Sequence, residues 1–283
     1  MDLRVASYNI HKGVLGHGPT KRASILELES ALQGLQPDLV FLQEVQFLHQ
    51  LHARRFALWP QQPQHDFLAQ ALDMHAAYRT NACTRHGEHG NALLSRYPIL
   101  DVAHCDVSDH RFEQRGLLHA QVALPEGGPL HCIVVHFGLF AVSRQRQTER
   151  LLDYIAAEVP QQAALIVAGD FNDWHGRIGP QLLRQGLVDV SQPAVKANGK
   201  TIWRHRVRTF PARLPLIPLD RIYTRGLVAS EIGLGWGRGW ARLSDHAPLL
   251  ASLRCIQPAC PETSKGEVSA LRPTVTAPTG VAT

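Results

Sequence analysis

The stretch AALIVAGDFN, residues 163–172, joins six apolar residues to a polar end that contains Asp170 and Asn172. The apolar run is short and bounded by glycine and polar residues, so it predicts a buried strand. The stretch DLVFLQEV at 38–45 has the same character and carries Glu44 near its end. Because a buried strand holds the side chain after it rigidly, both ends are suitable positions for a site.

The rest of the chain predicts a mixed α/β architecture. Apolar residues at helical spacing predict a helix over 20–35 with Thr20 as its N-cap, a weaker helix over 65–75, and a helix from the capping residue Ser143 to about 158. Apolar runs predict strands over 1–6, 91–95, 117–124, 130–137, 163–168, 220–223 and 247–253. Strands outnumber helices and several follow one another directly, which indicates mixed sheets rather than regular alternation.

Length and composition bound the domain organisation. The chain has 283 residues, of which 45% are hydrophobic and 19% charged, and its net charge is +5. We expect one domain over 1–256, followed by a disordered tail at 257–283 rich in Pro, Thr, Ser and Ala. Five cysteines without a CxxC pair suggest neither a disulfide framework nor a zinc site. No secretion signal or membrane-spanning stretch is visible, so a cytoplasmic location is expected.

Several strand ends carry carboxylate, amide or imidazole side chains. They are SYN at 7–9, LQE at 42–44, VVH at 134–136, AGDFN at 168–172, LDRIY at 219–223 and LSDH at 243–246. Taken singly, each has an ordinary explanation: Glu44 as a surface residue, His136 as a core histidine, DFN as a turn. Taken together they predict one site, because converging carboxylates need a cation or histidines among them. Oxygen ligands without cysteine favour magnesium or manganese over zinc.

These polar groups follow one another in a fixed order along residues 3–254. The order is Asn9, Glu44, His136, GDFN at 169–172, LDRIY at 219–223 and SDHAP at 244–248. It resembles the endonuclease/exonuclease/phosphatase superfamily, which includes deoxyribonuclease I. The strings YNIHKG at 8–13 and HGNALLSRYPI at 89–99 are most similar to an uncharacterised bacterial branch. The resemblance implies a four-layered α/β sandwich, with two packed central sheets flanked by helices, and a magnesium-dependent hydrolase of phosphate esters.

The resemblance also implies a role for individual residues. The implied metal ligands are Asn9, Glu44, Asp170 and Asp245. The implied catalytic residues are His136, Asp170, Asn172, Asp220 and His246. Within these sets Glu44 is expected to be the main ligand of Mg²⁺ or Mn²⁺, and Asp220 is expected to orient His246. Asp170 would position or deprotonate the attacking water, while Asn172 and Arg115 would contact phosphate oxygens.

Two positions depart from well-known branches of the superfamily. His11 stands where the AP endonucleases carry an aspartate, which weakens the case for a second metal position like theirs. The carboxylate that supports the histidine equivalent to His136 in deoxyribonuclease I could correspond to Glu88, although the alignment is not fixed to one residue.

Two loops are expected to border the cleft. Residues 198–218 include Arg206 among several basic residues and contain no acid, and residues 234–242 carry Trp236 and Trp240. Basic residues interleaved with aromatics suit phosphates with stacked bases, and equally an anionic lipid surface. The alternative is that these are solvated loops whose aromatics pack on the core.

The leading function is therefore a metal-dependent phosphodiesterase that acts on nucleic acid. A phospholipid or sphingolipid headgroup phosphodiesterase and a phosphomonoesterase are alternatives. A non-enzymatic binding module is disfavoured, because such a module would have lost Glu44, Asp170, Asn172 or His246 and none is missing.

Overall fold

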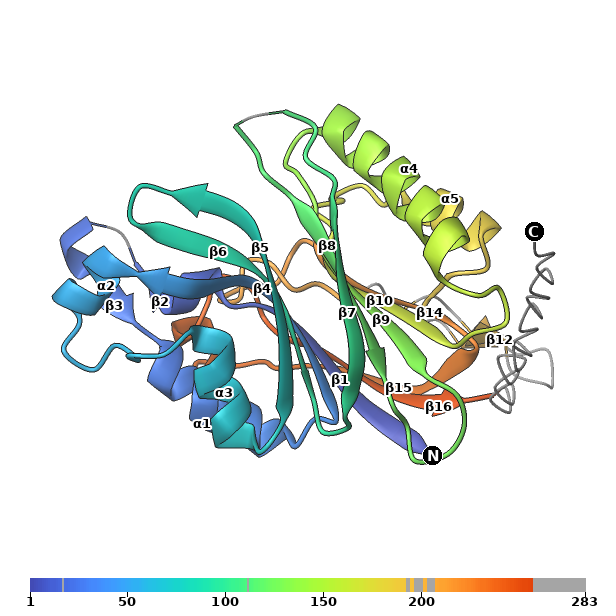
Figure 1. Cartoon of the computed structure of the whole chain (residues 1–283), viewed down its shortest axis with the longest axis horizontal. Helices are drawn as coiled ribbons and strands as arrows, with labels where there is room; N and C mark the ends of the chain where they lie inside the picture. The colour runs from blue at the N-terminus through green and yellow to red at the C-terminus, as the bar shows by residue number, and fades with distance from the viewer. Residues whose placement is uncertain (17, 111, 192–193, 196–200, 203–206, 257–283) are drawn as a thin grey trace, which may run out of the picture.

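Two six-stranded sheets form the centre of the computed structural model, which describes residues 1–16, 18–110, 112–191, 194–195, 201–202 and 207–256 (Figure 1). The first sheet has the order β15-β16-β1-β4-β6-β5. Its strands are β1 Asp2–Asn9, β4 Leu39–His49, β5 His75–Thr84, β6 Gly87–Ser95, β15 Leu227–Leu234 and β16 Leu249–Cys255. The second sheet has the order β11-β14-β10-β9-β8-β7. Its strands are β7 Ile99–Asp106, β8 Gly116–Val122, β9 Leu130–His136, β10 Leu165–Asp170, β11 Val188–Asp189 and β14 Asp220–Arg225.

Helices and short elements complete the described chain. The helices are α1 Ile25–Leu35, α2 Gln50–Arg55, α3 Gln64–Leu72, α4 Ala141–Glu158 and α5 Gly179–Arg184. The 3₁₀ turns are η1 His11–Gly13, η2 Gly18–Thr20 and η3 Trp240–Arg242. Two small ribbons pair β2 Val14–Leu15 with β3 Arg22–Ala23, and β12 Ala194–Val195 with β13 Thr201–Ile202. None of the helices in the described ranges combines the length and hydropathy that crossing a membrane requires.

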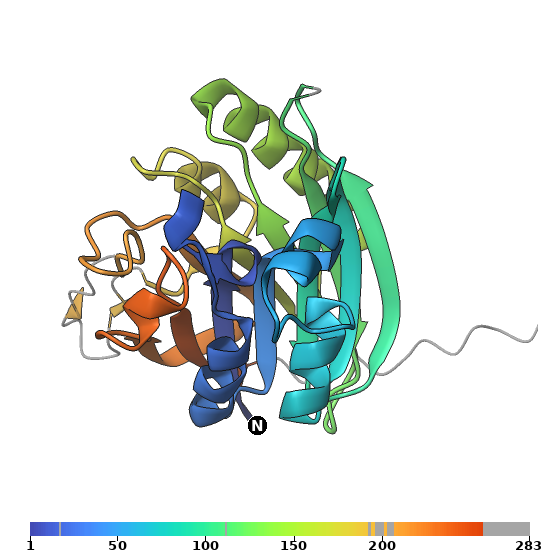
Figure 2. The same ribbon diagram turned by 90° about the vertical axis from the view of Figure 1, so that its left-hand side faces the viewer.

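The sheets pack face to face and each is covered by helices on its outer side, so the four-layered sandwich expected from the sequence is confirmed (Figures 1 and 2). Side chains on alternate sides of a strand enter different cores. On β10, Ile166 packs between the sheets, whereas Leu165 and Val167 pack under α4 and α5. On β1, Val5 packs between the sheets, whereas Tyr8 packs under α1 and α3.

Two parallel strand pairs at the middle of the sheets bring the polar strand ends together. β1 runs parallel to β4, and Asn9 lies opposite Gln43. β10 runs parallel to β9 and antiparallel to β14, so Asp170 lies between His136 and Asp220 in register. Since the carboxyl ends of parallel neighbours meet at one edge, both sheets carry their polar residues to the same end of the sandwich.

Three predicted helix boundaries were wrong. The first helix is capped at Ser24, not Thr20, because 22–23 are extended in the β2–β3 ribbon; the Ser24 hydroxyl donates to the Leu243 carbonyl. Ser143 lies inside α4 rather than capping it, and its hydroxyl donates to Asp109. The second helix ends before His75, because Asp73 adopts a left-handed conformation (φ 53°) that stops the helix. The predicted tail at 257–283 lies outside the described residues and stays a prediction.

Candidate active site

Asn9 links the two sheets at the polar end of the sandwich. Its side-chain amide donates to Asp170 Oδ2 across the sheets (3.1 Å) and to Glu44 Oε1 on the neighbouring strand (3.3 Å). Its carbonyl oxygen Oδ1 accepts from the His11 backbone amide (3.0 Å). Two carboxylates that the sequence placed 126 positions apart, at 44 and 170, therefore share one amide group.

The Glu44 carboxylate is directed by an irregularity in β4. The pairing of β4 with β6 shifts register between Leu42 and Val45, and Glu44 itself has φ 56°. Such a bulge re-aims one side chain without ending the strand. Burial raises the pKa of Glu44, but the charges of Lys12 and His11 and the Asn9 hydrogen bond oppose it and hold the pKa below its usual range. The carboxylate is therefore ionised, and Lys12 Nζ lies 3.5 Å from Oε2.

Asp220 and His246 form a buried ion pair that faces Asp170. Asp220 Oδ2 lies 2.8 Å from His246 Nδ1, and the imidazole Nε2 lies 3.7 Å from Asp170 Oδ2. Burial lowers the pKa of His246, but the Asp220 and Asp170 carboxylates outweigh it and raise it to about 10. The Ser244 hydroxyl accepts from the His246 amide (3.3 Å) and donates to the Asn9 carbonyl (2.7 Å), which fixes the loop to β1.

Asp170 is the meeting point of the site. Besides Asn9 and His246, its Oδ2 lies 3.7 Å from His136 Nε2, and its Oδ1 accepts the Asn172 backbone amide (3.0 Å). Burial raises the pKa of Asp170 to about 6, with His246 opposing and Asp220 adding to the rise. Burial also holds the pKa of His136 well below its usual range, and the charge of Arg115 lowers it further.

The backbone around Asp170 is specialised for this arrangement. Gly169 has φ 151°, and a methyl group there would overlap the Val135 carbonyl oxygen on β9. Only glycine fits this approach. Asn172 has φ 48°, and its side-chain amide donates to the Phe137 carbonyl (2.9 Å). Both features turn the GDFN segment so that Asp170 and Asn172 stay beside β9.

Asp245 is held by His11. The His11 Nδ1 lies 3.3 Å from Asp245 Oδ1, and this contact raises the pKa of the imidazole. The position that departs from the AP endonucleases therefore carries a partner for a predicted metal ligand. Glu88, the candidate to support His136, accepts from the Cys83 thiol instead (3.7 Å). Its support of His136 therefore stays a prediction.

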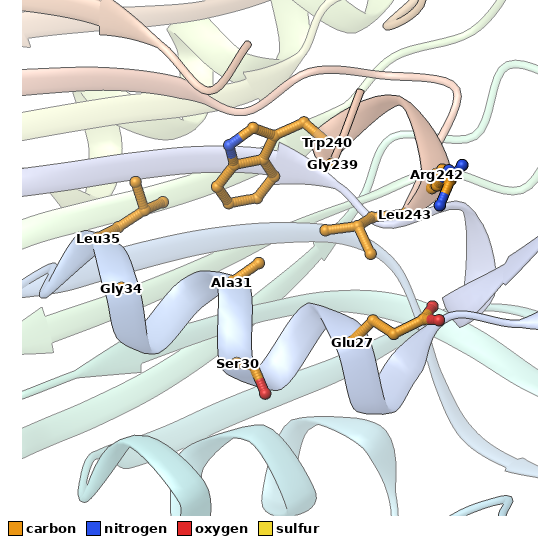
Figure 3. Close-up of a pocket in the computed structure, with 9 residues that line it drawn as sticks. All are labelled: Glu27, Ser30, Ala31, Gly34, Leu35, Gly239, Trp240, Arg242 and Leu243. Carbon is orange, nitrogen blue, oxygen red and sulfur yellow. The ribbon is translucent and has the colours of Figure 1, made fainter. Parts of the chain in front are cut away.

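The predicted substrate contacts fall in different places. Arg115 is nearly buried, and its guanidinium donates to the Phe137 carbonyl (3.3 Å) and to Glu113 Oε1 (3.4 Å). Trp236 is 72% exposed and lines a groove on the loop side of β15 with residues of 207–218. Trp240 packs edge-to-face on Tyr8 (5.8 Å between centroids) and lines a separate pocket against α1 (Figure 3). Arg206 lies outside the described residues.

Four carboxylates (Glu44, Asp170, Asp220 and Asp245) and three imidazoles (His11, His136 and His246) thus gather where a cation could bind. Asp170, Asp220 and His246 each offer a ligand atom within 4.8 Å of the others. Asp220 Oδ1 is buried and has no hydrogen-bond partner within the described part of the chain. Asp220 is balanced by protonated His246, whereas the carboxylate oxygens of Glu44 and Asp170 meet at the Asn9 amide, and such an oxygen-rich donor set fits a divalent cation that prefers oxygen.

Sequence reasoning missed two features of this region. Lys12, whose ammonium lies 3.5 Å from Glu44 Oε2, directly follows the string YNIH and could have been noticed there. An exposed apolar rim consists of Phe112, Leu139, Phe140, Val142 and Trp174, which are 50–82% exposed. Phe112 and Phe140 both contact the His110 ring. The rim is adjacent to the site in sequence, because Leu139 follows His136 and Trp174 follows Asn172.

Known proteins are similar to this chain in sequence and in fold. The Endonuclease/Exonuclease/phosphatase family model matches residues 6–246. The Uncharacterized protein YbhP of Escherichia coli K12 is 37% identical over 252 residues, which cover 88% of this chain and 95% of that protein. An endonuclease/exonuclease/phosphatase from Beutenbergia cavernae superposes with TM-score 0.68 at 18% identity, covering 90% of this chain and 72% of that one.

A second solved structure extends the likeness in fold. D. rerio TDP2, complexed with a single-strand DNA product, superposes with TM-score 0.59 at 19% identity, covering 89% of this chain and 99% of that one. The match of the family model over most of the chain and the gathered residues at the sheet edge agree. The chain belongs to the endonuclease/exonuclease/phosphatase family, a family of phosphoesterases and nucleases.

Proposed function

We propose that this protein is a phosphodiesterase that acts on nucleic acid and requires Mg²⁺ or Mn²⁺. The observation that carries the proposal is the environment of Asp170. One of its oxygens lies near two imidazole Nε2 atoms, at 3.7 Å each, and accepts from the Asn9 amide, while Glu44 stands on the other side of that amide. An acid–base pair and an ionised carboxylate therefore border one small space, as hydrolysis of a phosphate ester requires.

The proposed metal ligands are Glu44, Asp170, Asp245 and Asn9, the last through its oxygen Oδ1, which also accepts from the His11 amide. His246 is a poor ligand despite its place in the Asp170–Asp220 cluster, because its Nδ1 is bonded to Asp220 and the raised pKa keeps the ring protonated. Glu44 is ionised and reachable, with 17% of its side chain exposed. The bound cation would act as a Lewis acid on the phosphate, whose charge repels an attacking nucleophile.

The remaining residues supply proton transfer and hydrogen bonds. A pKa of about 6 suits Asp170 to accept a proton from the attacking water near neutral pH. Protonated His246 can donate from Nε2 to phosphate, and Asp220 holds it in that state and orientation. The Asn172 amide uses one N–H on the Phe137 carbonyl and has a second for a phosphate oxygen. His136 and Arg115 border the same space and complete the donors proposed for the charge of the transition state.

Nucleic acid is the substrate class that the surroundings favour. The net charge of +5 suits a polyanion. The exposed rings of Phe112, Phe140, Trp174 and Trp236 suit stacking on unpaired bases. Arg206 and Trp240 stay proposed contacts of the same kind. The solved TDP2 complex with single-strand DNA product is an example of this fold with such a ligand.

A lipid headgroup is the second candidate substrate, because Leu139, Phe140 and Val142 expose three apolar side chains within four residues. Such a cluster also suits insertion into a membrane interface. A phosphomonoester is the third alternative, since the same residues can act on a terminal phosphate.

A substrate panel tests the proposal. Single-stranded oligodeoxynucleotide, phosphatidylglycerol vesicles, bis(p-nitrophenyl) phosphate and p-nitrophenyl phosphate are assayed with Mg²⁺, with Glu44→Ala as the blank. We expect the wild type to cleave the oligonucleotide, and the blank to lose that activity. Phe140→Ser should impair whichever large substrate the rim binds while sparing bis(p-nitrophenyl) phosphate. Hydrolysis of only the vesicles, or only the monoester, would refute the assignment to nucleic acid.

A further inference from the structure

A second polar pocket lies beside the site, between β4, α2 and the β5–β6 hairpin. It is lined by Lys12, Lys21, Gln46, His49, His52, Thr84, Gly87, Glu88 and His89. Figure 1 shows α2 and the tip of the β5–β6 hairpin at the same end of the molecule. Lys12 belongs to both places, because it lines this pocket and lies 3.5 Å from Glu44 Oε2. The pocket and the proposed metal site therefore share Lys12 as a common border.

Hydrogen bonds fix which atoms the pocket presents. His52 Nδ1 lies 2.9 Å from Gln46 Oε1, which only accepts, so His52 carries its proton on Nδ1. Its Nε2 then accepts from the Lys21 ammonium at 3.3 Å. The His52 backbone amide donates to His49 Nδ1 at 3.2 Å, so a neutral His49 carries its proton on Nε2. His49 Nε2 and the two further N–H groups of Lys21 are therefore donors.

The charges of the pocket are only partly balanced. The hydrogen-bond partner of Lys21 is a neutral imidazole, which does not cancel its charge. Burial lowers the pKa of Lys21, and the charges of Lys12 and Arg55 add to the effect. Burial and Lys21 likewise lower the pKa of His49. Glu88 is the carboxylate among the lining residues, and it accepts from the Cys83 thiol on the hairpin. Positive charge therefore lies on the side of Lys21, and the carboxylate of Glu88 lies on the hairpin side.

The walls of the pocket are held in place before any ligand arrives. Gln64 accepts from the Gln46 backbone amide (2.8 Å) and donates to the Lys12 carbonyl (2.9 Å), which ties η1 to β4. The hairpin rests on β4 at Gly87, where a methyl group would overlap the Leu48 carbonyl oxygen. The cavity holds about 180 Å³, against about 30 Å³ for one water in the liquid. A phosphate group with several waters fits this space.

We propose that this pocket binds a second phosphate group of the substrate, the one next to the phosphate that is cleaved. Lys21 and His49 donate to its oxygens, and Lys12 bridges the two phosphate positions. This inference rests on the proposed function, because it takes the substrate to be a polynucleotide strand with phosphates in series. Donors to a charged phosphate are the stronger kind of hydrogen bond, so the loss of one should be measurable.

The kinetic test compares thymidine trinucleotide dTpdTpdT, which offers a second phosphate, with dinucleotide dTpdT, which does not. The measured quantity is the ratio of kcat/KM values, trinucleotide over dinucleotide. We expect Lys21→Gln to lower this ratio about tenfold and Glu88→Gln to raise it. Arg54→Gln, which removes the same charge from an exposed position of α2 outside the lining residues, should leave it within twofold. An unchanged ratio in Lys21→Gln would overturn the proposal.

A binding test separates this proposal from the proposed function. Inorganic phosphate is titrated into the full-length protein with EDTA present, and imidazole ¹H–¹⁵N NMR correlations are followed, with His49→Gln identifying the His49 signal. We expect a saturable shift of the His49 Nε2 signal that Lys21→Gln weakens and Arg54→Gln does not. If this shift occurs in a protein that cleaves no diester, the pocket binds phosphate but the proposed phosphodiesterase activity is wrong. If the protein cleaves the oligonucleotide and the His49 signal does not shift, the phosphodiesterase activity is supported and phosphate binding in this pocket is refuted.

Discussion

Replacing Asp220 with asparagine should separate its charge from its shape. Asp220 Oδ2 lies 2.8 Å from His246 Nδ1, and the two side chains are 0% and 7% exposed. Asparagine has the same size and keeps an oxygen that can accept from Nδ1, so the imidazole need not move. The negative charge is lost, however, and with it the largest influence that raises the pKa of His246. The pKa of His246 then falls, so a smaller fraction of the ring is protonated near neutral pH and able to donate to phosphate.

The expected loss of turnover is about 10²-fold, the lower end of the range for a positioned acid–base group. We expect a similar loss for His246→Ala, since Asp220 acts through that imidazole. The double variant should be little worse than either single change, because residues that act as a unit are not additive. Two independent residues would instead give a combined loss of about 10⁴-fold. The assay is hydrolysis of bis(p-nitrophenyl) phosphate at saturating Mg²⁺ by the wild type and the three variants.

A second buried ion pair supplies the control. Asp189 Oδ2 lies 3.2 Å from Arg221 Nη1, with both side chains 3% exposed, at the far strand of the same sheet. Asp189→Asn should lower the melting temperature, because breaking a buried pair leaves an unpaired charge, while turnover of the folded protein persists. Multiplicative losses in the double variant, or an equal loss of turnover in Asp189→Asn, would refute the idea that Asp220 works through His246.

The remaining predictions concern metal, backbone and pH. EDTA should abolish turnover, and Mg²⁺ or Mn²⁺ should restore it. Mg²⁺ should also raise the melting temperature of the wild type but not that of Glu44→Gln. Full activity without metal would contradict the proposed role of the cation. Gly169→Ala should destabilise the fold by roughly 2 kcal/mol or more, because the new methyl group overlaps the Val135 carbonyl oxygen and the residue has a positive φ. Gly34→Ala, on the open face of α1, should stabilise the fold slightly. Denaturant unfolding measures both changes. Burial, together with the charges of His119 and Arg225, lowers the pKa of His131 to about 4. Between pH 6.5 and 4 the unfolded chain therefore binds more protons at this histidine than the folded chain does. The contribution of neutral His131 to the unfolding free energy should be fully present above pH 6.5 and should be lost as the pH falls towards 4. His131→Asn should flatten that pH dependence of the unfolding free energy, and an unaltered slope would rule out this histidine as the cause.

Much of the fold could be predicted because buried strands appear in the sequence as short, continuous apolar runs. The run LIVAGD at 165–170 is apolar on both faces, since one face enters the core between the sheets and the other packs under α4. Helix starts were less predictable, because they depend on distant partners. Ser24 is the N-cap residue of α1, where its hydroxyl donates to the Leu243 carbonyl, and that contact joins residues far apart in the chain. Spacing alone could not choose between Thr20 and Ser24.

The residues of the site were predictable as types, but their partners were not. Glu44 and Asp170 lie at or near the end of an apolar run and His246 comes shortly before one, which marks them in the sequence. The sharing of the Asn9 amide by Glu44 and Asp170 depends on how the two sheets pack, and no local pattern encodes that. The surroundings of the two tryptophans were equally unpredictable from the local sequence. Both follow β15, yet Trp236 is exposed while Trp240 packs on Tyr8.

The backbone itself marks the site independently of any motif. Six non-glycine residues of the described chain have positive φ. Two of them, Gln36 and Asp73, simply end α1 and α3, where a left-handed residue is common. The other four are His11, Lys12, Glu44 and Asn172, and each of them contacts a residue of the candidate site. A left-handed conformation costs a side-chain-bearing residue about 1–2 kcal/mol, so tertiary structure must enforce it at each position. Glycine would relieve the strain but lacks a functional side chain, so the presence of a charged or polar side chain at these four positions favours a role in chemistry over a role in stability.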